Sequence, residues 1–191
     1  MIPRGLSRMQ IPNSWVRCLK DIQKTFPDAV IAGGCLRDLD LGRAPKDIDI
    51  FVPRTTHESV ELYLSTFNKE DILRDFKSYG NFANKDVARV VTMTHSQLKA
   101  DGLNVELIAV DVDKTNVMSR FDFGICQICY DGDLIKYTGH YLNDKIVKRF
   151  RLLRCDNQEQ FDRSLRRWES IKSRYEDFTF DPGEFGIYYD R

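Results

Sequence analysis

The sequence predicts an α+β fold in which short apolar strands alternate with amphipathic helices. Three observations predict it: an apolar-periodic stretch near the N-terminus, a strand–helix–strand pattern over residues 30–52, and two β-branched segments between residues 87 and 110. The 191 residues, of which 42% are hydrophobic and 30% charged, are enough for one domain with a small appendage. No apolar run approaches the ~20 residues of a membrane span, and the N-terminus lacks a signal-peptide core. We therefore expect a cytoplasmic protein that does not contact a membrane.

The first helix is predicted from residues that recur at helical spacing. It begins after Asn13 or Ser14, which can cap it, and Pro27 ends it. Its apolar face consists of Trp15, Leu19, Ile22 and Phe26. This stripe is typical of core packing.

A compact strand–helix–strand unit follows. Val30 to Ala32 form a short apolar strand that breaks at Gly33-Gly34. A short helix is expected from Cys35 to Leu41, because Gly42 closes it and Pro45 prevents its continuation. Glycine allows a close approach of the backbone to a ligand, and a helix N-terminus offers free N–H groups to an anion. The bend therefore indicates a phosphate site.

Two carboxylates begin the second strand of this unit. Asp47 and Asp49 alternate with Ile48 and Ile50, and residues two apart on a strand share one face. Two adjacent carboxylates repel each other unless a cation lies between them or one is protonated. Mg²⁺ prefers carboxylates and substrate phosphates as ligands. The unit therefore predicts a metal-dependent triphosphate site, although a tight turn followed by two solvated aspartates is the alternative.

This stretch resembles the signature of the class II nucleotidyltransferases, the CCA-adding enzymes and bacterial poly(A) polymerases of the polymerase-β superfamily. The matching residues are Gly33-Gly34-Cys35-Leu36-Arg37-Asp38, Leu41-Gly42-Arg43 and Asp47-Ile48-Asp49. The resemblance implies a polymerase-β-like nucleotidyltransferase fold, with a mixed sheet packed against helices. It also implies two Mg²⁺ ions and an NTP as substrate.

The resemblance further implies a third carboxylate on a strand beside Asp47 and Asp49. Strands are expected over Val87–Thr94 and Leu103–Val110, and Glu106 is the acid within the second of them. Glu106 resembles the residue that completes the metal site of the superfamily. The alternative is an acid on an edge strand that faces water.

A second motif, Ser119 to Cys126, resembles the family's Arg-Arg-Asp-Phe-Thr-Ile-Asn element. Arg120, Asp122, Phe123 and Ile125 match, whereas Phe121, Gly124 and Cys126 depart from the pattern. The resemblance implies that Arg120 and Asp122 contact the nucleotide. A salt-bridged loop that enters a strand is the alternative.

The remaining segments are expected to form helices, a β-hairpin and connecting loops. A helix begins at Thr55 or Thr56, a mixed polar region with a Gly80-Asn81 turn follows, and residues 125–137 form a β-hairpin around Asp131-Gly132-Asp133. A basic helix over Tyr141–Leu153, a final helix over Gln158–Tyr175 and an aromatic tail complete the chain. We therefore expect a catalytic domain over residues 1–140 and a helical extension over residues 141–191 packed on it.

The predicted function is Mg²⁺-dependent transfer of a nucleoside monophosphate to a hydroxyl. The expected catalytic metal ligands are Asp47, Asp49 and Glu106. The nucleotide is expected to be bound by Gly33, Gly34, Arg37, Asp38 and Lys46. The basic residues of the last two helices favour an RNA acceptor, above all a tRNA 3′ end. The short chain resembles minimal stand-alone enzymes of phages and toxin–antitoxin systems. Nucleotidylation of a protein or small molecule, and a non-catalytic nucleotide-binding module, are the alternatives.

Overall fold

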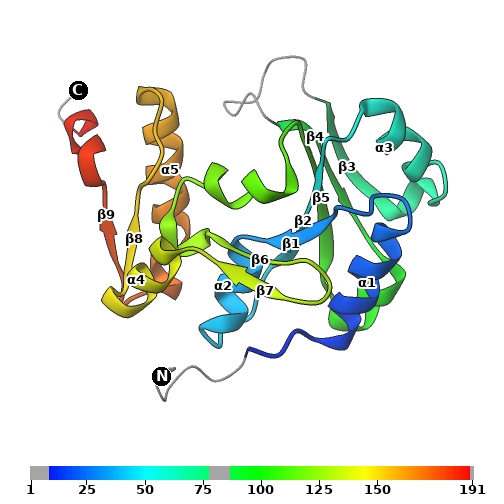
Figure 1. Cartoon of the computed structure of the whole chain (residues 1–191), viewed down its shortest axis with the longest axis horizontal. Coiled ribbons are helices and arrows are strands. Elements are labelled where there is room, and N and C mark those ends of the chain that lie inside the picture. The colour runs from blue at the N-terminus through cyan, green and yellow to red at the C-terminus, as the bar shows by residue number, and fades with distance from the viewer. Residues whose placement is uncertain (1–8, 78–86, 190–191) are drawn as a thin grey trace.

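A seven-stranded mixed sheet forms the centre of the computed structural model, which describes residues 9–77 and 87–189 (Figure 1). Its strand order is β3-β4-β5-β2-β1-β6-β7, in which β2 and β5 run parallel and the other neighbours run antiparallel. The strands are β1 Val30–Ala32, β2 Asp47–Pro53, β3 Ile72–Lys77, β4 Val87–Met93, β5 Asn104–Val110, β6 Ile128–Tyr130 and β7 Ile135–Tyr137. The predicted α+β class, with a mixed sheet packed against helices, is confirmed.

Three helices pack with this sheet around the main core. They are α1 Asn13–Gln23, α2 Gly34–Asp40 and α3 His57–Leu64. Their apolar side chains meet Ile48 and Ile50 of β2 and Val105 and Leu107 of β5, all of which are buried. Because side chains alternate along a strand, the odd residues of β2 and the even residues of β5 lie on the opposite face of the sheet.

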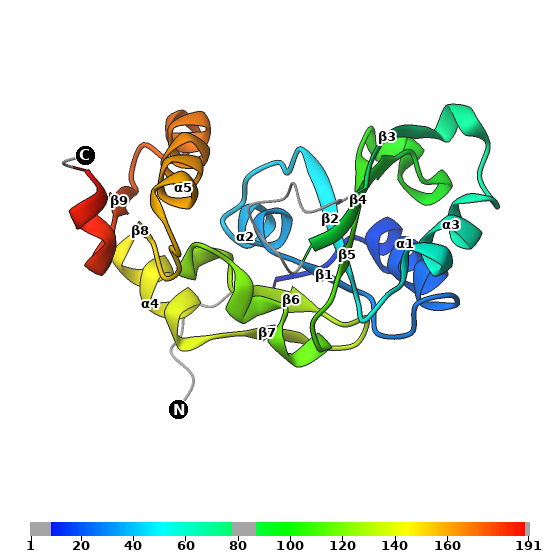
Figure 2. The ribbon, with the colours of Figure 1, turned by 90° about the horizontal axis from the view of Figure 1, so that it is seen from above.

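The C-terminal part of the chain lies at the opposite end of the molecule from α1 and α3 (Figures 1 and 2). It contains the helices α4 Gly139–Val147 and α5 Gln158–Ile171, and the parallel strand pair β8 Arg149–Arg151 and β9 Thr179–Asp181. Phe150 packs against the rings of Trp168, Tyr175 and Phe178 and is fully buried. This aromatic cluster continues the main core and joins the C-terminal segment to the rest of the protein.

One sequence prediction about these elements is wrong, and one strand was not predicted. The helix expected over Tyr141–Leu153 ends at Val147, because Lys148 adopts a left-handed backbone conformation with φ 57° and the next three residues pair with β9. The mixed polar region contains an edge strand, β3, which the sequence pattern did not indicate because many of its side chains are polar. The predicted turn at Gly80-Asn81 lies outside the described residues. No helix in the described ranges is long and apolar enough to cross a lipid bilayer.

Candidate active site

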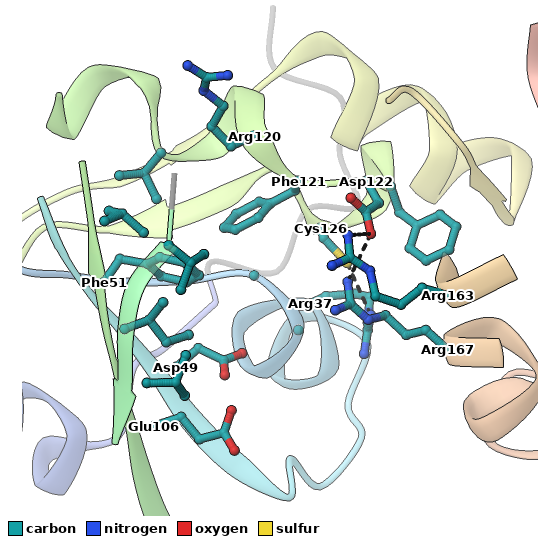
Figure 3. A pocket seen from close by; sticks show the side chains of 18 of the residues that line it. Arg37, Asp49, Phe51, Glu106, Arg120, Phe121, Asp122, Cys126, Arg163 and Arg167 are labelled. Carbon is teal, nitrogen blue, oxygen red and sulfur yellow. Dashed lines mark hydrogen bonds and ion pairs between the residues drawn. The ribbon is translucent and has the colours of Figure 1, made fainter. Parts of the chain in front are cut away.

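The three predicted metal-binding carboxylates lie on one face of the sheet. β2 and β5 run parallel in a register that places Asp49 directly opposite Glu106 and Asp47 opposite Asn104. Asp47, Asp49 and Glu106 are all half-buried, whereas Ile48, Ile50, Val105 and Leu107 between them point into the core. Figure 3 shows the carboxylates of Asp49 and Glu106 pointing to the same side.

Burial raises the pKa values of all three carboxylates, and neighbouring acids raise those of Asp49 and Glu106 further. Burial, followed by the charges of Asp47 and Glu106, raises the pKa of Asp49 to about 7. Burial and the charge of Asp47 raise the pKa of Glu106, and burial raises that of Asp47. Both burial and nearby negative charge disfavour the ionised form of a carboxyl group.

The paired glycines lie beside this carboxylate group. Gly33 has φ +87°, a conformation that favours glycine. A Cβ added there would lie 3.8 Å from Asp49 Oδ2 and 3.6 Å from the ring of Phe121. α2 begins at the next residue, Gly34. The bend therefore lies in van der Waals contact range of the Asp49 carboxylate.

The carboxylates suit Mg²⁺ as a donor set without forming a closed cage. Among the described residues, no group of three or more His, Cys, Asp or Glu side chains forms a ready metal site. Mg²⁺ commonly takes one or two carboxylates and completes its shell with water and substrate phosphates. Hard oxygen donors with raised pKa values, open to a cavity, fit that mode of binding.

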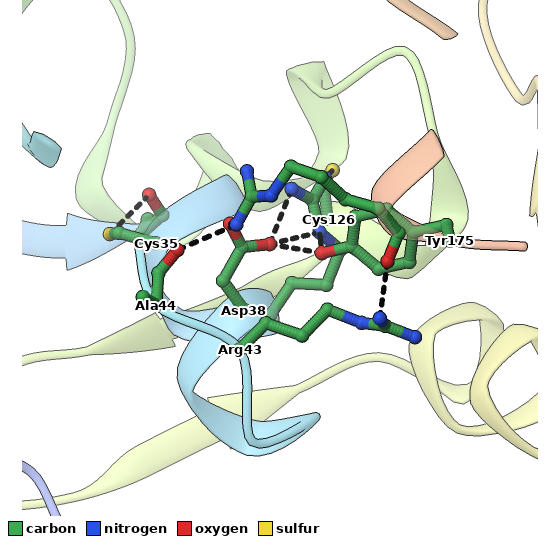
Figure 4. Close-up of polar contacts among 9 residues, drawn as sticks. Cys35, Asp38, Arg43, Ala44, Cys126 and Tyr175 are labelled. Atoms are coloured by element: carbon green, nitrogen blue, oxygen red, sulfur yellow. Dashed lines mark hydrogen bonds and ion pairs between the residues drawn. The ribbon is translucent and has the colours of Figure 1, made fainter. Parts of the chain in front are cut away.

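Arg37 and Asp38 are both buried and belong to one polar network. Figure 4 shows Asp38 and Tyr175 of this network in contact. Arg37 donates to Asp38 Oδ1 at 2.6 Å and to the hydroxyl oxygen of Tyr175 at 2.8 Å. The Tyr175 hydroxyl donates to Asp38, and Arg174 donates to Asp38 Oδ2 at 2.9 Å. Arg37 also lies over the rings of Phe150 and Tyr175. Its Nη2 would be 3.5 Å from a Cβ at Gly34, which places the guanidinium beside the bend.

The second motif contributes the ring of Phe121 and the carboxylate of Asp122, which is hydrogen-bonded to side chains of α5. Phe121 packs edge-on against Phe51 with ring centroids 5.2 Å apart. Asp122 is buried and accepts from Ser164 at 3.0 Å and from Arg167 at 3.3 Å, and Arg163 lies 3.8 Å away. The carboxylate of Asp122 therefore binds α5 in this structure.

A cavity of about 450 Å³ joins these groups. Gly33, Gly34, Arg37, Asp49, Glu106, Arg120 and Asp122 line it, together with Arg163 and Arg167 of α5. Figure 3 shows the three arginines Arg37, Arg163 and Arg167 gathered on one side and Phe51, Asp49 and Glu106 on the other. Lys46 and Asp47 lie at a smaller adjoining pocket that shares Gly34, Arg37 and Asp49.

The sequence reasoning missed Arg163 and Arg167 as individual site residues. Their spacing of four places them on one face of α5, away from the apolar stripe, and this was the available signal. The structure also pairs most basic residues of the C-terminal segment with acids of this chain. The pairs are Lys145–Asp40, Lys148–Asp177, Arg149–Asp144, Arg151–Asp181, Arg154–Asp156, Lys172–Glu169 and Arg174–Asp38.

The fold defines a class of protein. The structure is similar to that of a Thermotoga maritima CCA-adding enzyme complexed with tRNA, with a TM-score of 0.63 and 18% identity over 97% of this chain and 43% of that one. It is also similar to a Bacillus stearothermophilus CCA-adding enzyme in complex with CTP, with a TM-score of 0.59 and 19% identity over 90% of this chain and 42% of that one. The chain thus spans less than half the length of these enzymes and has the fold of a nucleotidyltransferase head domain.

The particular family is different from the one that the motifs resemble. The family model of Gad2, the Gabija anti-defense 2 family, matches residues 8–150, and this chain belongs to that family. No curated protein matches the sequence. The resemblance to CCA-adding enzymes is therefore confirmed for the fold, whereas the sequence family is Gad2.

Proposed function

We propose that this protein is a nucleotidyltransferase that transfers a nucleoside monophosphate from an NTP to a hydroxyl and releases pyrophosphate. One observation carries the proposal: Asp49 and Glu106 are register partners on one sheet face, and the Gly33 bend lies against Asp49. Carboxylates beside a phosphate-binding bend are the arrangement that metal-assisted phosphoryl chemistry requires.

Asp47, Asp49 and Glu106 are the proposed metal ligands. Bound Mg²⁺ would neutralise charge on the reacting phosphates and make the attacking hydroxyl more acidic. The chain's own contribution is to hold the three carboxylates on adjacent strands, so that the substrates are positioned with little rearrangement.

The cationic side of the cavity is the proposed triphosphate site. The backbone at Gly33 and Gly34 and the N-terminus of α2 offer N–H groups, and Arg37 lies beside them with its orientation fixed by Asp38 and Tyr175. Arg163 and Arg167 add positive charge from α5. We therefore propose a catalytic domain over residues 1–140 to which the segment 141–191 adds arginines.

The acceptor has two candidates, each supported by a different observation. An RNA 3′ end, such as that of a tRNA, is supported by the CCA-adding fold. A protein or small molecule is supported by the anti-defense description of the family and by the ion pairs that occupy most basic residues of the C-terminal segment. An RNA substrate obtains most of its non-specific affinity from unoccupied cations.

The test is a pyrophosphate-release assay with each of the four NTPs, Mg²⁺ and separate acceptor pools of bulk tRNA, protein and metabolites. Transfer of α-phosphate label to a pool, lost in the double variant Asp47→Asn/Asp49→Asn, would support the proposal. Nucleotide binding without pyrophosphate release from any pool would instead identify a non-catalytic binding module.

A further inference from the structure

The cavity continues past the carboxylates along the same face of the sheet. Asp49 and Phe51 share a face of β2, and Glu106, Ile108 and Val110 share a face of β5. The strand register places these side chains in successive rows across the sheet. Asp49 lies beside Glu106 in the first row, and Ile108 lies between Phe51 and Val90 in the second. Val110 lies beside Val87 in the third. Because residues two apart on a strand are roughly 6.8 Å apart, the apolar rows begin about one side chain away from the carboxylates.

Apolar side chains from outside the sheet also line this half of the cavity. Val117 and Phe121, which come from the segment between β5 and β6, line it opposite the strands. Phe51, Val90, Ile108 and Phe121 are only half-buried, so their surfaces remain available to a ligand. We call this half of the cavity the apolar channel and define it by Phe51, Val90, Ile108, Val110, Val117 and Phe121.

The direction of the reaction assigns a substrate to the apolar channel. In phosphoryl transfer the attacking oxygen and the leaving oxygen are roughly in line on opposite sides of the reacting phosphorus. In the proposed triphosphate site the β- and γ-phosphates would leave toward the side of the cavity on which Figure 3 shows Arg37, Arg163 and Arg167. The acceptor therefore approaches Asp49 and Glu106 from the other side, which is the apolar channel.

The low charge of the apolar channel favours an aromatic acceptor over an RNA end. Among the described lining residues on this side, Arg120 alone carries a charge. An RNA end brings a phosphate with every nucleotide and requires several cations along its path. An aromatic ring requires only apolar walls and ring edges, which Phe51 and Phe121 provide in their edge-on arrangement.

We propose that the apolar channel binds a tyrosine side chain of a protein acceptor and that the enzyme attaches the nucleoside monophosphate to its hydroxyl. The inference rests on the proposed function and specifies its acceptor. The tyrosine Oη forms a bond to the α-phosphorus as the bond from that phosphorus to the α,β-bridging oxygen breaks. Pyrophosphate departs with the bonding electrons, and the phenolic proton passes to solvent.

The experiment compares three acceptor probes: N-acetyl-tyrosinamide, N-acetyl-serinamide and bulk tRNA. Each is incubated with Mg²⁺ and each α-³²P-labelled NTP, and both labelled acceptor and pyrophosphate are measured. We expect the tyrosine probe to be labelled at least tenfold faster than the serine probe, and tRNA to remain unlabelled. Labelling of tRNA or of serine at an equal or higher rate would overturn the inference while the proposed function stands. No pyrophosphate and no label with any probe, or with the protein and metabolite pools, would overturn both.

A substitution in the channel separates the acceptor from the nucleotide. Val90→Lys places a charge in the channel, and Val90→Thr changes polarity at constant shape in case the lysine variant does not fold. Either folded variant is expected to reduce tyrosine labelling at least tenfold and to leave the Kd of a fluorescent NTP analogue within twofold. Leu62→Lys on α3, where the leucine is 71% exposed, is the matched control and should change neither value. A parallel loss of NTP binding in the Val90 variants would assign the channel to the base and overturn the inference.

Discussion

The hydroxyl of Tyr175 donates a hydrogen bond to Asp38, 137 residues earlier in the chain. Asp38 lies on α2, the helix that begins at the paired glycines, and the same hydroxyl accepts from Arg37 Nε. The C-terminal segment thus holds the arginine that lies beside the proposed phosphate site. This relationship makes the C-terminal segment part of the site's architecture.

Tyr175→Phe should weaken NTP binding because it removes the hydrogen bonds that orient Arg37. Tyr175 is fully buried, so we expect a loss of about 1–2 kcal/mol in the free energy of unfolding. We expect roughly a tenfold rise in KM for the NTP, since a lost hydrogen bond of that size corresponds to about tenfold in affinity, and a smaller change in kcat. Denaturant unfolding and steady-state kinetics measure both. Tyr137→Phe, at a site that is 47% exposed, is the control, and equal effects of the two variants would contradict this role.

Gly33→Ala should weaken NTP binding and also lower the free energy of unfolding. The φ of +87° is strained for alanine, and the added methyl group would lie near Asp49 and Phe121. We expect a stability loss of about 1–3 kcal/mol and at least a tenfold weaker Kd for the NTP. Gly102→Ala is the matched control, because Gly102 also has a positive φ, +66°, but nothing lies within 4 Å of the added Cβ. If Gly102→Ala weakened NTP binding equally, backbone strain alone would explain the effect.

The contribution of Asp49 to the stability of the protein without Mg²⁺ should fall as the pH rises from about 4 to 7. The folded-state pKa of Asp49, about 7, lies above the 3.8 of the free side chain. The folded protein therefore retains a proton in this range that the unfolded chain has lost, and the contribution of Asp49 to stability decreases with increasing pH. We expect Asp49→Asn in EDTA to remove a pH-dependent component on the order of a few kcal/mol.

The same measurement at pH 7.5 tests the metal site. Added Mg²⁺ should raise the melting temperature of the wild type and leave that of Asp49→Asn unchanged, because binding to the folded state alone stabilises it. If the unfolding free energies of the wild type and of Asp49→Asn depended on pH in the same way between pH 4 and 7 in EDTA, Asp49 would not be in the environment described.

Arg167→Ala should weaken triphosphate binding without unfolding the protein. Arg167 is exposed, lines the cavity and pairs with Asp122. Loss of one charge-assisted contact of about 1.5–3 kcal/mol corresponds to a rise in KM of at least tenfold. Arg166→Ala, the exposed neighbour outside the cavity lining, provides the comparison in nucleotide titrations. Indistinguishable KM values for the two variants would remove Arg167 from the phosphate site.

The strand–helix–strand unit was predictable because its signals are local. Gly33-Gly34, Pro45 and the alternation of Asp47 and Asp49 each restrict the backbone of a few neighbouring residues, and β1, α2 and β2 form where expected. Alternation also assigned Asp47 and Asp49 to one face. Glu106 was recognisable as an acid within a strand, but its position opposite Asp49 depends on a register between segments 57 residues apart.

The sequence alone determined the fold class, the bend and the carboxylates, because turn chemistry and side-chain alternation act over a few residues. Only the tertiary structure decided that Asp122 binds α5, that Arg163 and Arg167 enter the cavity, and that Tyr175 positions Arg37. It also decided that residues 149–151 form a strand, since their partner lies about thirty residues later. These contacts join distant segments, and their free energy comes from packing and burial that no local pattern encodes.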